Sequence, residues 1–183
     1  MVPMRQWSGI FLLALALIMG TACGKSSSTS KTLRVGFVPA EDAQQVIQNA
    51  QPIVDILRKR LGMEVQPFVA TDYTGVVEAL RVNKLDIAFL TPASYVLAKS
   101  EANVRVALKS ERKGNPYYYA AIITRADSGI KKLEDLRGKT FAFGDPLSTS
   151  ANVFPRKMFH DRGIDPVRDF KQILYSGGHD ATV

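Results

Sequence analysis

The chain has 183 residues, of which 46% are hydrophobic and 22% are charged, and this composition excludes an intrinsically disordered protein. The length suffices for one full domain or two small ones. The formal net charge is +7, but the basic residues are scattered and form no run of five or more, which argues against a nucleic-acid-binding protein. The charge instead indicates a weak preference for anionic ligands or lipid headgroups.

The first 22 residues have the pattern of an export signal. Arg5 supplies a positive start, residues 10–20 form an apolar stretch too short to span a bilayer comfortably, and small residues follow. The stretch "MGTAC" then ends at Cys23, the only cysteine of the chain. It resembles the bacterial lipobox, in which the signal is removed before a cysteine that becomes lipidated, although Gly20 stands where that motif most often has leucine. The alternative is an ordinary signal peptide with an incidental thiol.

Residues 23–31 are interpreted as the lipidated cysteine and a flexible Ser-rich tether, so the folded part is expected to begin near Thr32. From there short apolar strands alternate with segments of helical periodicity. The expected elements are a strand over 32–38, a helix over 46–61, a strand over 64–70, a helix over 73–82, a strand over 86–90, a helix over 91–99, and strands over 103–109 and 117–124. This alternation is typical of a mostly parallel, doubly wound sheet.

Four of these expectations concern particular residues. Pro52 is expected to break the first helix into two pieces or to open its second part, and Pro67 indicates an edge strand or a bulge. The strand over 86–90 is expected to be buried. Thr91 and Pro92 predict a helix start, because a hydroxyl at the N-cap precedes a proline at the first helical position.

The pattern indicates a second unit, so residues 32–120 are interpreted as one lobe and residues 121–183 as a second, incomplete lobe. The expected elements of the second lobe are a short helix over 133–136, a strand over 140–143, a helix that carries residues 153–159 and a strand over 170–175. Pro155 would lie inside a helix that starts at Ser150, so this helix is expected to be kinked or to have a separate first turn. The sequence ends at Val183 where a further helix is expected to begin, and the chain is therefore interpreted as stopping within a domain.

Polar or aromatic side chains follow four of the predicted strands. In an open α/β sheet, ligands bind beyond the carboxyl ends of the strands, where helix N-termini offer free N–H groups and partial positive charge. The candidate binding residues on this basis are Tyr73, Thr91, Tyr95, Ser148, Thr149, Ser150 and His179. One hydroxyl suffices to cap a helix, so three in succession over 148–150 favour an anion site over a cap alone. The alternatives are a solvent-facing loop for His179 and a core or rim position for Tyr73 and Tyr95.

Metal binding finds no support in the sequence, because His160 and His179 are far apart and neither lies in a cluster with ligand spacing. No cofactor is expected. A serine hydrolase is a weak alternative, and its residues would be Ser148 or Ser150 with His179 and Asp180. No G-x-S-x-G elbow surrounds either serine, and adjacent histidine and aspartate residues rarely form a relay.

The mature part of the chain contains the stretches "VGFVPAEDAQQV", "PIVDILRKRLGMEV", "ATDYTGVVEALRVNKLDIAFLTPASYVLA", "LEDLRGKTFAFGDPLSTSANVFPRKMFHDRGIDP" and "SGGHDATV". Together with the lipobox, they resemble the phosphate/phosphite/phosphonate-binding lipoproteins of ABC transporters. The likeness runs from Cys23 to Val183. It implies the α/β fold of a type II periplasmic binding protein, with two doubly wound lobes that close about a hinge on a phosphorus oxyanion, the second lobe being truncated in this chain.

The resemblance also implies a role for the candidate residues. The hydroxyl triplet, residues 148–150, matches the family's anion-binding helix start, Tyr73 and Tyr95 match its two pocket tyrosines, and His179 matches its pocket histidine. Ala151 departs from the pattern, since relatives often have glycine directly after the triplet.

The function that the resemblance implies is that of a receptor held by its N-terminal lipid on the periplasmic or extracellular face of the membrane. It would capture a phosphonate, phosphite or phosphate and deliver it to an ABC permease without covalent chemistry, so no enzyme activity is expected. An alternative with the same fold and ligand class is a lipid-anchored sensory module that signals to a partner.

Overall fold

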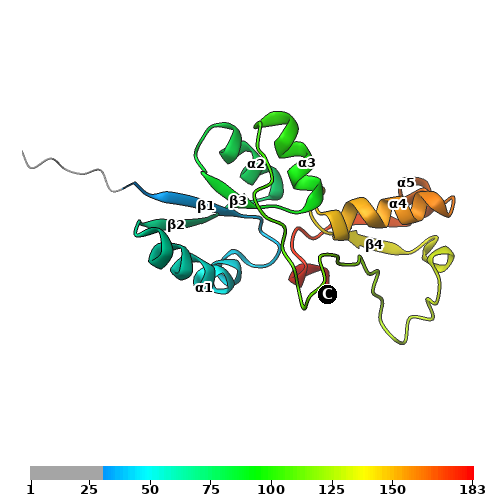
Figure 1. Ribbon diagram of the computed structural model, residues 1–183. Helices are drawn as coiled ribbons and strands as arrows, with labels where there is room; N and C mark the ends of the chain where they lie inside the picture. Colours follow the sequence, from blue (N-terminus) through cyan, green and yellow to red (C-terminus); the bar gives the residue numbers. More distant parts are fainter. Residues whose placement is uncertain (1–30) are drawn as a thin grey trace, which may run out of the picture.

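The computed structural model describes residues 31–183, and these contain two parallel β-sheets (Figure 1). The first sheet has the strand order β2-β1-β3, and the second has the order β4-β5. The predicted signal over 1–22 and the lipidated Cys23, with its tether up to residue 30, lie outside the described residues. Within residues 31–183, no helix combines the length and the apolar character needed to cross a bilayer.

The elements of the first unit follow one another in the predicted order. They are β1 (Leu33–Phe37), α1 (Ala43–Leu61), β2 (Val65–Val69), α2 (Tyr73–Arg81), β3 (Ile87–Phe89) and α3 (Pro92–Glu101). Both strand pairs are parallel, and Figure 1 shows α1 on one side of the sheet and α2 and α3 on the other. The prediction of a parallel, doubly wound sheet is therefore confirmed for this part of the chain.

Apolar residues at helical spacing hold α1 against the sheet. Ala50 and Val54 of α1 are buried against Val35 of β1 and Val65 of β2, whereas Leu61 at the end of the helix is exposed. Burial of a side chain such as Val54 contributes roughly 1.5–3 kcal/mol. The periodic pattern therefore identified the buried face of α1 correctly except at the last turn.

A glycine and an ion pair fix the other contacts of β1. A Cβ atom at Gly36 would come within 2.5 Å of Cδ1 of Leu85, so a larger residue here would force the Leu85 side chain to move. Arg34 donates to both carboxylate oxygens of Asp86, at 3.0 and 2.8 Å, and this contact lowers the pKa of Asp86 to about 2. These two contacts position the residues that lead into β3.

Two local predictions in this unit are wrong. Helix α1 runs unbroken through Pro52, because the proline lies on the exposed side of the helix, where water can satisfy the carbonyl that loses its N–H partner. Strand β3 is not buried: Ile87 and Phe89 are both exposed, since among the described residues β3 pairs with β1 alone. Pro67 does lie in an edge strand, β2, as predicted.

The strands predicted over 103–109 and 117–124 are also absent. Between α3 and the second unit, the described chain has one isolated bridge, between Arg112 and Asn115, and no strand. Apolar side chains here remain in contact with solvent, and Leu108 is 92% exposed. An apolar run becomes a strand only where a neighbouring strand supplies hydrogen-bond partners, and these two segments pair with neither described sheet.

The second unit has an aromatic core. Its elements are η1 (Leu133–Leu136), β4 (Thr140–Phe143), η2 (Thr149–Val153), α4 (Phe154–Asp161), α5 (Pro166–Asp169), β5 (Gln172–Tyr175) and η3 (Asp180–Thr182). Phe143 and Phe159 are fully buried. The rings of Phe141 and Phe170 meet the ring of Phe159 edge to face, with centroids 5.2 and 5.1 Å away. The short helix over 133–136 and the strand over 140–143 are confirmed.

The helix that was expected to be disturbed at Pro155 consists of two segments. A single π-helical turn, η2, comes first, and α4 then begins at Phe154. Pro155 therefore lies in the first turn of α4, where its missing N–H group is not needed. The expectation of a separate first turn is confirmed.

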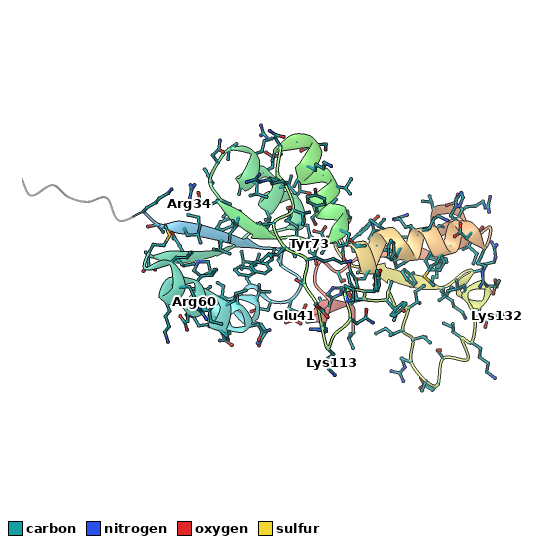
Figure 2. The ribbon with its side chains drawn as sticks, viewed as in Figure 1. Arg34, Glu41, Arg60, Tyr73, Lys113 and Lys132 are labelled. Atoms are coloured by element: carbon teal, nitrogen blue, oxygen red, sulfur yellow. The ribbon has the colours of Figure 1, made fainter. Side chains whose placement is uncertain are left out.

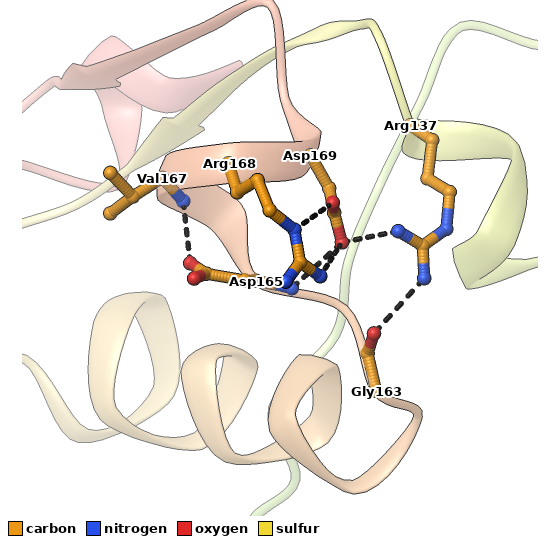
Figure 3. A network of polar contacts seen from close by, with 6 residues as sticks. All are labelled: Arg137, Gly163, Asp165, Val167, Arg168 and Asp169. Atoms are coloured by element: carbon orange, nitrogen blue, oxygen red, sulfur yellow. Dashed lines mark hydrogen bonds and ion pairs between the residues drawn. The ribbon is translucent and has the colours of Figure 1, made fainter.

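An ion cluster around Asp169 stabilises the second unit (Figure 3). The carboxylate of Asp169 accepts hydrogen bonds from Arg137, from Nε of Arg168 at 2.9 Å and from the backbone N–H of Asp165 at 2.9 Å. The Arg168 guanidinium and the Asp165 N–H hold the pKa of Asp169 well below its usual range. Arg137 also donates to the carbonyl of Gly163 at 3.0 Å, so the cluster joins α5 to the turn after α4 and to the start of β4.

Candidate functional site

Three helices begin where the two units meet. Asp72 caps α2, Thr91 caps α3 and Ser148 caps η2, and each side chain accepts a backbone N–H of the first turn that follows it. Figure 2 shows Tyr73, the first residue of α2, in the middle of the molecule between the two units. Helix N-termini carry partial positive charge, so this convergence favours a negatively charged group. We call the region the junction and define it by Tyr73, Thr91, Asp145, Ser148 and Thr149.

Asp145 makes the first link across the junction. It lies two residues after the end of β4 and is only 6% exposed. Its Oδ1 accepts from the backbone N–H of Leu147 at 2.7 Å, and its Oδ2 accepts from the backbone N–H of Tyr73 at 3.2 Å. The second bond crosses from one unit to the other. Asp145 thus places a buried negative charge beside the N-terminus of α2, where backbone dipoles stabilise it.

Thr149 makes the second link. Its Oγ1 accepts from the backbone N–H of Ala93, in the first turn of α3, at 2.9 Å. The hydroxyl of Thr91 lies 2.8 Å from Oγ of Ser94 and donates across the junction to the carbonyl of Leu147 at 3.5 Å. Side-chain hydroxyls of both units therefore satisfy backbone groups of the opposite unit.

Ser148 and Tyr73 form the most deeply buried part of the junction. Both are almost fully buried, and Oγ of Ser148 accepts from the backbone N–H of Ala151 at 3.3 Å. Burial raises the pKa of the Tyr73 phenol, and the neighbouring Ser148 side chain opposes that rise. The phenol is therefore neutral near pH 7 and can donate a hydrogen bond to an anion.

Ser150 and His179 lie beside the junction and line one cavity. Its volume is about 370 Å³, and most of the other side chains in its wall are apolar, among them Ile122, Ile130 and Phe141. Sites for small molecules have volumes of about 300–1,000 Å³, so the cavity has the size of a small-molecule site. His179 itself is exposed, and its backbone N–H donates to the carbonyl of Ala40 at 2.8 Å. This bond ties the end of the described chain to the segment after β1.

Tyr95 occupies a different position from the other predicted residues. It is half-buried in α3, and its backbone N–H donates to the carbonyl of Thr91 at 2.8 Å. The structure gathers four predicted residues in the junction and two beside it, namely Tyr73, Thr91, Ser148 and Thr149, then Ser150 and His179. Tyr95 contributes neither to the cavity wall nor, among the described side-chain hydrogen bonds, to the junction.

Backbone donors complete the set of groups available to a ligand. Within residues 31–183, the N–H groups of Thr149 and Ser150 have no hydrogen-bond acceptor, although they begin a helical turn. The same residues contain no group of three or more His, Cys, Asp or Glu side chains placed to hold a metal ion. The chemistry that the junction offers is hydrogen bonding to an anion by hydroxyl and amide donors.

Two residues that make hydrogen bonds across the junction were missed by sequence reasoning. Asp145 lies in "GDP" directly after the strand over 140–143, and an acidic side chain at the carboxyl end of a strand was the available signal. Ala93 contributes only its backbone N–H, and a backbone group has no signature in the sequence.

A family model described as "ABC transporter, phosphonate, periplasmic substrate-binding protein" matches residues 35–183. The chain belongs to this family. The family membership that the sequence motifs predicted is therefore confirmed, and so is the fold of a type II periplasmic binding protein. Members of this phosphonate-binding family are periplasmic by description, which indicates an extracytoplasmic location.

Individual proteins with similar sequences or structures carry names of the same kind. The phosphonates-binding periplasmic protein of Escherichia coli K12 is 33% identical over 152 residues, which are 80% of this chain and 45% of the relative. The phosphate-import protein PhnD of Mycolicibacterium smegmatis is 29% identical over 187 residues, covering 92% and 58% of the two chains. The binding protein component of an ABC phosphonate transporter from Pseudomonas aeruginosa superposes with a TM-score of 0.72 at 28% identity, covering 82% and 52%. The chain spans about half the length of these relatives.

Proposed function

We propose that the protein is an extracytoplasmic receptor that binds a small phosphorus oxyanion, a phosphonate, phosphite or phosphate, and delivers it to an ABC permease. Relatives named for phosphonate binding and for phosphate import support this ligand class. The observation that carries the proposal is the meeting of three capped helix N-termini at the junction, with the hydroxyl triplet on one side and Tyr73 on the other.

The junction suits a tetrahedral oxyanion because its donors come from both units. The free N–H groups of Thr149 and Ser150 and the Ser150 hydroxyl belong to the second unit, and the Tyr73 phenol belongs to the first. A ligand held between them draws the two units together and excludes water, and this strengthens each charge-assisted hydrogen bond. The free energy of ligand binding then also drives the closure of the two units.

Binding without covalent chemistry agrees with the arrangement around His179. The carboxylate of Asp180, the partner that a hydrolytic relay would need, accepts instead from the backbone N–H of Asp42 at 3.1 Å. Among the described side-chain hydrogen bonds, none joins the His179 imidazole to a serine of the triplet. We therefore assign His179 to ligand binding, as a hydrogen-bond donor at the edge of the cavity.

The receptor is proposed to be held at the membrane by lipid on Cys23, with residues 24–31 as the tether. A lipid anchor keeps a periplasmic receptor near its permease, which raises the effective concentration of the complex. Replacement of Cys23 by serine should abolish incorporation of labelled palmitate and move the protein from the membrane fraction to the soluble fraction. Retention of the label in C23S would show that the anchor lies elsewhere.

Calorimetric titration of the full-length mature protein tests the ligand class. The compounds are methylphosphonate, 2-aminoethylphosphonate, phosphite, inorganic phosphate and sulfate. We expect tight binding of at least one phosphorus compound and weak or no binding of sulfate. An absence of binding heat with all four phosphorus compounds would overturn the proposal.

Ser148→Ala tests the site. Loss of a hydrogen bond to a charged ligand costs about 1.5–3 kcal/mol, which corresponds to a Kd that is weaker by about 10- to 150-fold. Ser100→Ala is a matched control, because the Ser100 hydroxyl donates to the carbonyl of Leu97 on the exposed side of α3, away from the junction. Equal affinities of S148A and S100A would remove Ser148 from the binding site.

A further inference from the structure

A chain of polar contacts lies behind the hydroxyl triplet and is built from Asn152 and Arg156. Asn152 is 7% exposed, and its Nδ2 donates to the carbonyl of Pro146 at 2.6 Å. The Oδ1 atom of the same side chain accepts from Nε of Arg156 at 2.9 Å. Arg156 in turn donates from Nη2 to the phenol oxygen of Tyr175 at 2.5 Å. The chain therefore runs from the loop before the triplet to the end of β5.

Arg156 is also fixed by an aromatic ring. Its guanidinium lies over the ring of Phe143, 4.3 Å from the centroid, and Phe143 is the fully buried last residue of β4. Figure 1 shows α4, which carries Arg156, lying along β4. A cation stacked on a buried ring and hydrogen-bonded on two sides has little rotational freedom. Arg156 thus gives Asn152 a rigid support at the ends of both strands.

The turn held by Asn152 has unusual backbone geometry. The N–H groups of Asn152 and Val153 both donate to the carbonyl of Ser148, at 3.1 and 3.0 Å, which makes η2 a π-helical turn. Such turns are rare and occur mostly at functional sites. The Asn152 side chain reaches back from this turn to Pro146 and so closes the loop that leads from Asp145 to Ser148.

We propose that Asn152 and Arg156 are positioning residues for the anion-binding turn. They fix the carbonyl of Pro146, and with it the path of residues 146–150, so that the free N–H groups of Thr149 and Ser150 are already oriented before a ligand arrives. Orienting these groups in advance lowers the entropic cost of binding. The inference rests on the proposed function for its effect on affinity, whereas its effect on the turn belongs to the ligand-free protein.

Two substitutions break the chain at different points. Asn152→Asp keeps the size of the side chain and the bond from Arg156, but it replaces the donor to Pro146 by an oxygen that repels the carbonyl. Arg156→Lys keeps the positive charge but removes the planar fork that stacks on Phe143 and bonds to Asn152. Lys157→Met is the matched control, since it removes a cation from the exposed face of the same helix.

The measurements are the Kd for methylphosphonate and for inorganic phosphate and the amide hydrogen exchange of residues 146–153 without ligand, on the full-length mature protein. We expect N152D and R156K each to weaken binding about fivefold and to accelerate exchange in the turn, and K157M to change neither. Wild-type affinity and wild-type exchange in R156K or in N152D would overturn the inference. If the wild type binds neither compound, the proposed function fails for these ligands, and the exchange data alone decide whether the two residues hold the turn.

Discussion

Two largely buried carboxylates of the second unit have opposite surroundings. Asp169, whose side chain is 9% exposed, is bonded to two arginines and to a backbone N–H of its own unit (Figure 3). Asp145, which is 6% exposed, accepts from backbone N–H groups, one of which belongs to Tyr73 in the other unit. The first carboxylate is neutralised by charges, and the second is stabilised by dipoles alone.

This difference separates a residue that stabilises one unit from a residue that joins the two units. A carboxylate between two guanidinium groups binds them strongly and leaves no donor for a ligand. The carboxylate of Asp145 is instead held by backbone N–H groups, one in the turn before Ser148 and one at the N-terminus of α2. The Asp169 cluster therefore lies within one unit, whereas Asp145 joins the two units.

The largest effect is expected for Asp145→Ala. The substitution leaves the N–H groups of Leu147 and Tyr73 without their acceptor, and each unsatisfied buried group costs about 1–3 kcal/mol. Urea unfolding should show this loss of stability. Asp145→Asn keeps one acceptor oxygen and should lie between D145A and the wild type. A wild-type unfolding curve for D145A would refute the role of Asp145 in the junction.

Thr149→Val is expected to have the next largest effect. Valine matches the shape of threonine, but it offers no acceptor to the N–H of Ala93, so one bond across the junction is lost. Loss of this bond costs about 1 kcal/mol in the closed state, and loss of a hydroxyl from the ligand site lowers affinity further. Titration and small-angle scattering of the ligand-bound protein measure the two consequences. Unchanged affinity and unchanged compactness in T149V would contradict the assignment.

Asp169→Asn should give the opposite pattern, with lower stability and unchanged ligand affinity. Because folding lowers the pKa of Asp169, its ion pairs stabilise the protein above the unfolded-state pKa of about 3.9 and cease to do so as the pH falls through the lower folded-state value. The difference in melting temperature between wild type and D169N should therefore be present at pH 7 and should shrink below about pH 4. A weaker Kd in D169N at an unchanged melting temperature would contradict the assignment of Asp169 to stability alone.

The sequence predicted the elements that form their own local hydrogen bonds or pair with strands close by in the chain. Helix starts such as Thr91–Pro92 and the strand over 140–143 carry signals within a few residues. The prediction of strands over 103–109 and 117–124 was wrong, because a strand needs a partner strand and a local apolar pattern does not specify one. The prediction that Pro52 interrupts α1 was wrong, because the effect of a proline on a helix depends on which side of the helix faces solvent.

The sequence predicted where the candidate site residues lie, but it did not predict the contacts that they make. The rule that ligands bind at the carboxyl ends of strands brought Tyr73, Ser148 and Thr149 to one place, and the structure puts them there. The acceptor role of Thr149 toward Ala93 could not be predicted, because it requires the relative placement of two units. For the same reason, the link between Asp145 and the N-terminus of α2 appears only in three dimensions.

The smallest effect is expected for Tyr95→Phe. Tyr95 is half-buried one turn into α3, so removal of its hydroxyl leaves no buried polar group unsatisfied and should leave the melting temperature unchanged. If closure brings this hydroxyl to the ligand, the affinity should fall about fivefold, the value of one ordinary hydrogen bond. Tyr117→Phe, at an exposed position outside both units' cores, is the control. A lower melting temperature with unchanged affinity in Y95F would assign Tyr95 to the packing of α3, and the site would then end at the first turn of that helix.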